Sequence, residues 1–178
     1  MSEKITVLVP EKEVDERIEF LGKQISKDYE GRQVHLICIL KGGAFFMCEL
    51  AKRITVPVSI DYMSVSSYGN RTSSSGVVRI AKDLDESIEG KDVLIVEDII
   101  DSGNTLCYVK NLLKERGCKS TKLCTLFDKP SRREAPVYAD YIGYEVANEF
   151  IVGYGLDFNE RYRNLPYVGV LKPEAYQL

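Results

Sequence analysis

The chain of 178 residues contains a single histidine, His35. One imidazole excludes a His-Glu-x-x-His metal site, and that ring would have to serve any Ser-His-Asp or Cys-His machinery. Because His35 lies inside an apolar run, we expect it to have a structural role. Catalysis would then depend on carboxylates, lysines, backbone amides or a metal ion.

Other features that the sequence lacks restrict its environment and partners. The five cysteines form no Cys-x-x-Cys pair, so we interpret them as small buried side chains in a reducing compartment. No apolar run approaches the ~18 residues of a membrane span, and no signal-peptide pattern opens the chain. The formal net charge of −3 provides no basic field for nucleic acid. We therefore expect a cytoplasmic protein that binds neither nucleic acid nor membrane.

Hydrophobic periodicity predicts the fold class. Helical spacing covers residues 10–29, 44–53 and 106–116, and strand-like apolar segments cover residues 34–40, 56–62, 93–96, 123–127, 141–144 and 150–154. This alternation predicts an α/β fold with a mainly parallel central sheet and helices on both faces. Without a linker or a second hydrophobic core, the whole chain, 1–178, is expected to form one domain. Ligands of such folds bind at the carboxyl ends of the strands.

The segment 64–76 contains six serines and two glycines and has no aliphatic residue after Val65. It cannot bury apolar surface, and this composition is typical of a mobile loop. Strand-like sequence ends at Tyr62 and resumes over residues 77–82. The simplest arrangement is a long hairpin with a flexible tip.

The most informative string is VLIVEDIIDSGNT, at residues 93–105. An apolar strand ends in the paired carboxylates Glu97 and Asp98, and a turn of small hydrogen-bonding residues then leads into a helix. The amides of this turn, at residues 101–105, would converge on the positive end of the helix and suit a phosphate monoester. Adjacent carboxylates suit sugar hydroxyls or magnesium-bound waters. The string therefore predicts a site for a phosphorylated sugar.

Each feature alone also has a simpler interpretation. Asp101 or Ser102 could cap the helix, and Glu97 and Asp98 could form a solvated strand end. Their combination at one strand-to-helix junction favours the functional interpretation. A receiver-like domain in which Asp98 or Asp101 accepts phosphate is an alternative, which the following Gly-Thr turn fits poorly. Neither a Walker nor a dinucleotide-binding glycine motif is present.

The same string resembles the phosphoribosyl-pyrophosphate motif of type I phosphoribosyltransferases. LKGGAFF, at residues 40–46, is similar to their pyrophosphate loop, and SSYGNRTSSSG, at 66–76, to their flexible catalytic loop. LFDKPSRR and FIVGYGLDFNERYRNLPY resemble the purine hood of the hypoxanthine (6-oxopurine) phosphoribosyltransferases. The resemblance extends over nearly the whole chain.

The resemblance implies a reaction and an architecture. The reaction is transfer of a 5-phosphoribosyl group from phosphoribosyl pyrophosphate to hypoxanthine or guanine, which gives IMP or GMP and pyrophosphate, with Mg²⁺ as cofactor. The implied architecture is a core over residues 30–130, with a base-binding hood formed mainly by residues 129–178 and the N-terminal segment. A cis peptide between Leu40 and Lys41 and a homodimer or homotetramer are also implied. A regulatory protein of this fold that senses phosphoribosyl pyrophosphate is the alternative to an enzyme.

The resemblance also implies roles at the base. Asp101 would accept the purine proton, and Lys129 would donate to the 6-oxo oxygen, a contact that an adenine amino group cannot satisfy. Phe150 would stack on the base. The main-chain carbonyls of Ile151 and Asp157 would face the amino group of guanine.

Further roles concern phosphoribosyl pyrophosphate and the metal. The implied ligand-binding residues are Lys41, Gly42, Gly43, Glu97, Asp98, Asp101, Ser102, Gly103, Asn104, Thr105 and Arg163. Glu97 and Asp98 would hold the ribose hydroxyls and metal-bound waters, and Asp157 would bind a second magnesium ion directly. Ser67 and Tyr68 of the mobile loop would close to keep water from the reacting centre.

Overall fold

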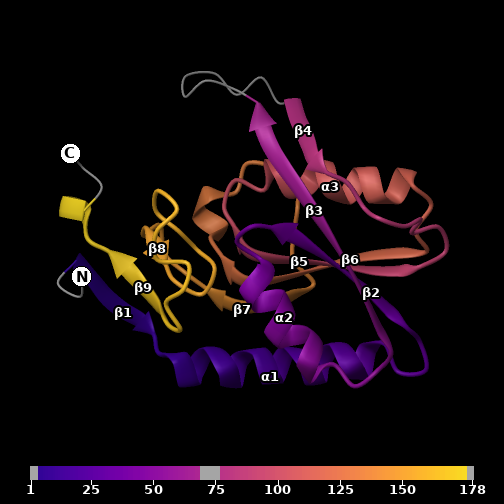
Figure 1. Cartoon of the computed structure of the whole chain (residues 1–178), viewed down its shortest axis with the longest axis horizontal. Helices are drawn as coiled ribbons and strands as arrows, with labels where there is room; N and C mark the ends of the chain where they lie inside the picture. The colour runs from indigo at the N-terminus through magenta and orange to yellow at the C-terminus, as the bar shows by residue number, and fades with distance from the viewer. Residues whose placement is uncertain (1–3, 69–76, 176–178) are drawn as a thin grey trace.

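The computed structural model describes residues 4–68 and 77–175. In these ranges, three α-helices accompany a six-stranded and a three-stranded β-sheet. The small sheet lies beside the large one, at the end of the molecule where both termini are found (Figure 1). The α/β fold class predicted from the sequence is confirmed.

The large sheet has the strand order β4-β3-β2-β5-β6-β7. Its strands are β2 (Val34–Leu40), β3 (Val58–Tyr68), β4 (Val77–Lys82), β5 (Asp92–Ile100), β6 (Ser120–Asp128) and β7 (Tyr141–Glu145). All neighbouring pairs are parallel except β3 and β4, which are antiparallel. The carboxyl ends of β2, β5 and β6 therefore meet at one edge of the sheet, where an α/β fold places its ligand.

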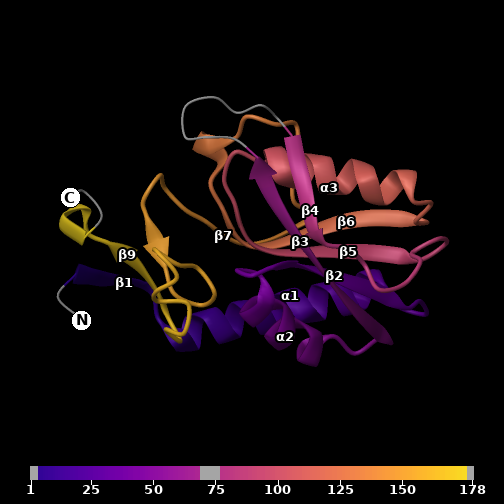
Figure 2. The same ribbon diagram turned by 45° about the horizontal axis from the view of Figure 1, so that its top comes forward.

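Helices cover both faces of this sheet, as predicted. They are α1 (Glu11–Asp28), α2 (Ala44–Arg53) and α3 (Asn104–Glu115). Figure 2 shows α1 and α2 on one side of the sheet and α3 on the other. Alternate residues of β2 divide accordingly, because Leu36 and Cys38 pack with α1 and α2, whereas Ile37 and Ile39 pack in the cluster that contains α3. Burial on both faces explains why β2 is apolar at nearly every position.

Helix α1 follows directly from its sequence. Val14, Ile18, Leu21 and Ile25 recur every three or four residues, and all four are fully buried. Pro10 precedes the helix, a position where its missing N–H costs no hydrogen bond. The result is an 18-residue helix that packs with α2 on one face of the sheet (Figure 2).

The small sheet has the order β1-β9-β8 and joins the two ends of the described chain. Its strands are β1 (Ile5–Val9), β8 (Ile151–Val152) and β9 (Val168–Leu171). β1 pairs antiparallel with β9, with Ile5 opposite Leu171. Neither β1 nor β9 was predicted. Most of β1 is exposed, so it has no buried stripe, and its strand conformation depends on a partner at the other end of the chain.

The expected boundary of the serine-rich loop is wrong. β3 continues past Tyr62 to Tyr68, and its last residues pair with β4, with Val65 opposite Ile80. Val65 and Ile80 pack against the core, but the β3 residues beyond Val65 are serines and a tyrosine joined to β4 by the backbone ladder, which is why composition did not indicate a strand there. The predicted hairpin is confirmed. Residues 69–76, and the side chains of Ser67 and Tyr68, lie outside what the structure describes.

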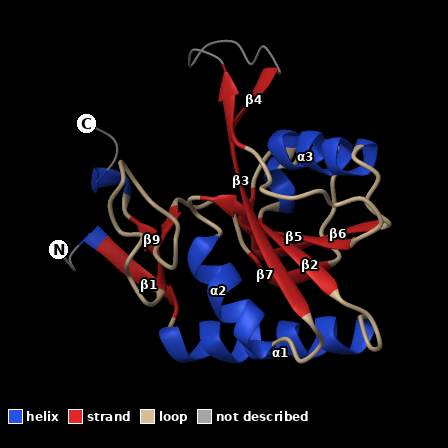
Figure 3. Ribbon diagram, turned by 45° about the vertical axis from the view of Figure 1, so that its right-hand side comes forward, coloured by secondary structure: helices blue, strands red, loops and turns tan. Residues whose placement is uncertain are grey.

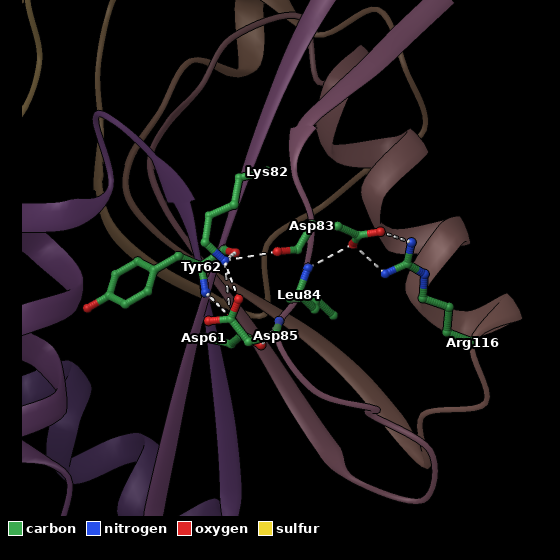
Figure 4. A network of polar contacts seen from close by, with 7 residues as sticks. All are labelled: Asp61, Tyr62, Lys82, Asp83, Leu84, Asp85 and Arg116. Atoms are coloured by element: carbon green, nitrogen blue, oxygen red, sulfur yellow. Dashed lines mark hydrogen bonds and ion pairs between the residues drawn. The ribbon is translucent and has the colours of Figure 1, made fainter.

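The base of this hairpin is fixed to the body of the protein (Figure 4). The buried carboxylate of Asp61 accepts hydrogen bonds from the amides of Tyr62 at 2.7 Å and Asp85 at 2.9 Å. Asp83 receives two hydrogen bonds from Arg116, at 2.6 and 2.8 Å. These contacts join β3, the segment after β4 and the end of α3. The far end of the hairpin projects past the other strands of the sheet (Figure 3).

The histidine and the cysteines have mainly structural positions. His35 is buried in β2, and its Nδ1 lies 2.8 Å from Ser59 Oγ, in agreement with a structural role. Cys38 and Cys124 are buried, and burial raises the pKa of the Cys38 thiol to about 12. The expectation of buried cysteines is wrong for Cys48, which is exposed on α2. No helix in the described ranges has the length and apolar character needed to cross a membrane.

Candidate active site

A cleft of about 320 Å³ opens at the carboxyl edge of β2 and β5. Nine residues predicted from the sequence line it: Lys41, Gly42, Glu97, Asp98, Asp101, Ser102, Gly103, Thr105 and Arg163. They come from the end of β2, the end of β5, the turn before α3 and a loop near the C-terminus. The fold therefore brings together most of the residues that the family resemblance assigns to phosphoribosyl pyrophosphate.

The turn between β5 and α3 forms one wall of the cleft. Gly103 caps α3 with a left-handed φ of +81°, a conformation that glycine adopts without strain. The amides of a first helical turn have no acceptor within their own helix, and here Thr105 and Leu106 of that turn line the cleft. Asn104 differs, because it lies outside the lining and its side-chain amide donates to Glu134 at 2.9 Å. This wall suits an anion.

Glu97 and Asp98 form the floor, each only 9% exposed. The Asp98 amide donates to Glu97 Oε1 at 3.1 Å, and the Ile99 amide donates to Asp98 Oδ1 at 2.8 Å. Burial raises the pKa of both carboxyls; the neighbouring Asp98 charge raises that of Glu97 further, whereas Arg163 opposes the increase at Asp98. A bound cation would stabilise the charged form of this pair.

The loop after β2 packs directly on this floor. The peptide bond between Leu40 and Lys41 is cis, as the resemblance implies. A Cβ added to Gly42 would overlap the Asp98 carboxylate, so only glycine fits there. The amide of Gly43 donates to the Ile39 carbonyl at 3.2 Å, and Gly43 does not line the cleft. Of the two glycines predicted to bind pyrophosphate, only Gly42 lines the cleft.

The two cations that line the cleft, Lys41 and Arg163, each form an ion pair with an acidic side chain. Lys41 Nζ lies 3.2 Å from Glu160 Oε1. Arg163 Nη2 lies 2.9 Å from Asp157 Oδ1, and Nη1 donates to the Gly155 carbonyl at 2.8 Å. Arg163 Nε is buried without a hydrogen-bond partner among the described residues. The two cations predicted to bind pyrophosphate are thus neutralised by the chain itself.

Glu160 was missed by sequence reasoning. The only signal was an acidic residue three positions before Arg163, a common arrangement on protein surfaces. Its exposed carboxylate contacts both predicted cations, and the Lys41 ammonium holds the pKa of Glu160 below its usual range. Glu160 therefore pairs with both of the cations that were predicted to bind an anionic ligand.

Two consecutive arginines, Arg132 and Arg133, contact Asp101. Arg132 Nε lies 2.9 Å from Asp101 Oδ1, and both side chains are about half exposed. Arg133 Nη1 donates to the main-chain carbonyl of Asp101 at 3.1 Å. Sequence reasoning assigned no role to either arginine, since it placed them only within the motif LFDKPSRR.

The residues predicted to bind the base lie outside the cleft lining. Lys129 is buried, which lowers its pKa, and its Nζ donates to the Glu149 carbonyl at 2.7 Å. The Phe150 ring is partly exposed and packs edge-on against Phe158. Ile151 is buried in β8, opposite Val170 of β9.

The predicted metal ligands do not form one cluster. Within the described ranges, no group of three or more acidic, histidine or cysteine side chains is arranged to hold a metal ion. Glu97 and Asp98 adjoin each other, whereas Asp157 pairs with Arg163 and accepts the Glu160 amide at 2.8 Å. Mg²⁺ commonly takes one or two protein carboxylates together with substrate phosphates and waters, so the Glu97–Asp98 pair alone fits that ion.

Comparison with known proteins identifies the family. Residues 9–159 match the model of the phosphoribosyl transferase domain. The chain belongs to this family.

Relatives of this phosphoribosyl transferase domain cover almost the whole chain. It is 52% identical over 171 residues to the hypoxanthine-guanine phosphoribosyltransferase of Bacillus subtilis, an alignment that covers 96% of this chain and 95% of the relative. The chain is 56% identical over 170 residues to the bifunctional protein TilS/HprT of Listeria innocua, and this alignment covers 96% of the chain. The chain spans only 26% of that longer protein.

Solved structures agree with the fold of the phosphoribosyl transferase domain. A hypoxanthine phosphoribosyltransferase from Staphylococcus aureus is 51% identical, with a TM-score of 0.93 and coverage of 96% of this chain and 93% of that chain. The hypoxanthine phosphoribosyl transferase of Trypanosoma cruzi is 39% identical, with a TM-score of 0.94 and coverage of 99% and 96%.

Gly42 allows a direct test of the floor geometry. We expect Gly42→Ala to weaken binding of phosphoribosyl pyrophosphate by at least about tenfold, because the new methyl group displaces the Asp98 carboxylate. Isothermal titration calorimetry measures the dissociation constant. Gly31→Ala is the control for backbone strain without a clash, since Gly31 has a left-handed φ of +73° and a Cβ there has no neighbour within 4 Å. An unchanged dissociation constant for Gly42→Ala would contradict the close packing of Gly42 on a functional carboxylate.

Proposed function

We propose that this protein transfers the 5-phosphoribosyl group of phosphoribosyl pyrophosphate to hypoxanthine or guanine, forming IMP or GMP and releasing pyrophosphate. The observation that carries the proposal is the meeting of two chemically different surfaces in one cleft. The buried carboxylates of Glu97 and Asp98 suit ribose hydroxyls, and the helix N-terminus at Thr105 suits the 5-phosphate. The activities named for the Bacillus subtilis and Staphylococcus aureus relatives support this choice.

The cationic residues assist departure of the leaving group. As the bond between ribose and pyrophosphate breaks, negative charge grows on pyrophosphate and positive charge on the ribose ring. Lys41 and Arg163 would neutralise the pyrophosphate charge. To do so, Lys41 would leave its ion pair with Glu160, and Arg163 would leave its ion pair with Asp157, so that both can bind the ligand. The Lys41–Glu160 pair is solvent-exposed, and such pairs contribute little to stability, so it opens at small cost.

Asp101 and Lys129 would act on the base. A ring nitrogen of the purine bonds to the ribose carbon and loses its proton, which the Asp101 carboxylate accepts once it separates from Arg132. The Lys129 ammonium, now bonded to the Glu149 carbonyl, would turn to the 6-oxo oxygen. Phe150, with the carbonyls of Ile151 and Asp157, would complete the base site. An ammonium can only donate, so an adenine amino group would leave it unpaired.

We propose Mg²⁺ as cofactor, with Glu97 and Asp98 near it. The pair fits this role because both carboxylates are buried and neither forms an ion pair with a side chain in the described ranges. When bound, the ion would stabilise charge on the departing pyrophosphate. Asp157 would join as a ligand only after separating from Arg163.

Larger features of the proposal concern closure, assembly and location. Residues 129–178 with the N-terminal segment would form a hood over the base, and Ser67 and Tyr68 would close the other side against water. Phe45 and Ile60 expose large apolar side chains, which supports assembly into a homodimer or homotetramer. We place the protein in the cytoplasm, with no nucleic-acid or membrane partner.

A spectrophotometric assay tests the reaction. With phosphoribosyl pyrophosphate and Mg²⁺, we expect nucleotide from hypoxanthine and guanine and none from adenine, with xanthine as the fourth base tested. Chelation by EDTA should abolish the rate, and added Mg²⁺ should restore it. Binding of phosphoribosyl pyrophosphate without nucleotide from any of the four bases would refute the enzyme and favour a sensor of that ligand.

The role of Asp101 predicts a selective loss of turnover. Asp101→Ala should lower kcat by about 10²–10⁴, the usual contribution of a general base, while the affinity for phosphoribosyl pyrophosphate changes far less. Steady-state kinetics and calorimetry separate the two effects. Asp15→Ala, which removes a partly exposed ion-paired carboxylate on α1, is the control. A parent-like kcat in Asp101→Ala would rule out the base.

The role of Lys129 predicts a change of specificity. Lys129→Gln replaces a group that only donates with an amide that also accepts, so the ratio of kcat/KM for hypoxanthine to that for adenine should fall by at least about tenfold. Lys129→Ala should lose the same discrimination through a lower rate with hypoxanthine. The proposal fails if both variants keep the purine preference of the parent.

A further inference from the structure

The base-binding segment is attached to the turn of the phosphate site by its main chain. Three amides of residues 129–135 donate to carbonyls on either side of Asp101: Lys129 to Ile100, the last residue of β5, at 3.0 Å, and Glu134 and Ala135 to Ser102 of the turn at 2.9 and 3.0 Å. The segment that carries Lys129 therefore rests on the turn that carries Asp101. The two groups proposed to act on the base belong to one hydrogen-bonded unit.

Arg133 completes this unit from within. Its side chain is only 12% exposed, and Nη2 forms an ion pair with the buried carboxylate of Asp128, the last residue of β6. Nη1 donates to the Asp101 carbonyl. Its Cδ also lies close to Gly103, 3.1 Å from where a Cβ on that glycine would stand. One planar group thus connects the end of β6, immediately before Lys129, with the main chain of Asp101.

We propose that Arg133 is a positioning residue that fixes Asp101 and Lys129 relative to each other. This inference rests on the proposed function and deepens it. A guanidinium presents its donors in a fixed plane, so Arg133 sets the distance between its two acceptors, whereas a lysine ammonium offers a single nitrogen. Misplacement of a reacting group by about 1 Å can cost 10²-fold in rate, so loss of this connection lowers turnover even though Arg133 touches no substrate.

Arg132 and Arg133 differ in a way that supports separate roles. Arg132 is half exposed and pairs with the Asp101 carboxylate itself, the group that must become available to the base. The Arg133 side chain is mostly buried and bonds the Asp101 carbonyl, so it does not occupy the carboxylate. Arg132 is therefore placed to release the Asp101 carboxylate when substrate binds, while Arg133 stays bonded to the Asp101 carbonyl.

Two substitutions separate positioning from simple stabilisation. Arg133→Lys keeps a cation beside Asp128 but cannot hold both acceptors, whereas Arg133→Gln removes the cation. We expect kcat to fall at least about tenfold in both variants, with a larger rise of KM for hypoxanthine than for phosphoribosyl pyrophosphate. The melting temperature of Arg133→Lys should stay within about 3 °C of the parent, while Arg133→Gln should melt lower because Asp128 loses its partner.

A second measurement does not depend on activity. Hydrogen exchange should become at least about tenfold faster at the amides of Lys129, Glu134 and Ala135 in both Arg133 variants, because these amides bond to Ile100 and Ser102, the neighbours of the Asp101 that Arg133 holds. The matched control is Arg116→Lys, which changes an arginine that bonds a single carboxylate, Asp83 (Figure 4), at the end of α3 opposite to the end that lines the cleft. The control should keep the parent kcat and the parent exchange rates at these three amides.

The outcomes distinguish this inference from the proposed function. If the parent forms no nucleotide, the proposed function fails, and unchanged exchange in the Arg133 variants would separately refute the structural connection. If the parent is active, parent-like kcat in Arg133→Lys overturns the positioning role. A fall in kcat without faster exchange at the three amides also contradicts it.

Discussion

Burial of the adjacent Glu97 and Asp98 carboxylates at the end of β5 is the constraint on which the rest of the site depends. Burial raises the pKa of both carboxyls, and the Asp98 charge raises that of Glu97 further, so the pair needs a cation or hydroxyl donors to remain charged. The chain supplies backbone amides at this point but no ion pair among the described residues. The two cations that line the same cleft, Lys41 and Arg163, form their ion pairs with Glu160 and Asp157 instead.

Charge pairs around the cleft fall into two kinds. The Lys41–Glu160 and Asp101–Arg132 pairs are exposed to solvent, and such contacts exchange readily because water compensates for their loss. The Arg133–Asp128 pair is buried, and separating it would leave an uncompensated charge. The exposed pairs suit groups that must change partners during a reaction, and the buried pair suits a fixed framework.

Local patterns predicted much of the fold and the phosphate half of the site. The bounds of β2 and α2 agree with the sequence, since burial on both faces and a helical stripe leave clear signals, and the junction after β5 was identified from the order of its side chains. Long-range contacts left no such trace. β1 is a strand only because β9 pairs with it, and Glu160 meets Lys41 only after the chain has folded. The arginine contacts of Asp101 likewise depend on how β6 lies beside β5.

The pairing of β1 with β9 has a consequence for the order in which the protein assembles. A ribosome makes β1 before the strands of the large sheet and β9 after them, and β9 is the only strand beside β1 in the described chain. The large sheet contains β2 to β7, so its strands all emerge while β1 still waits for a neighbour. During vectorial synthesis every strand of the sheet that holds the acidic cleft is therefore available before β9 emerges and the small sheet can close.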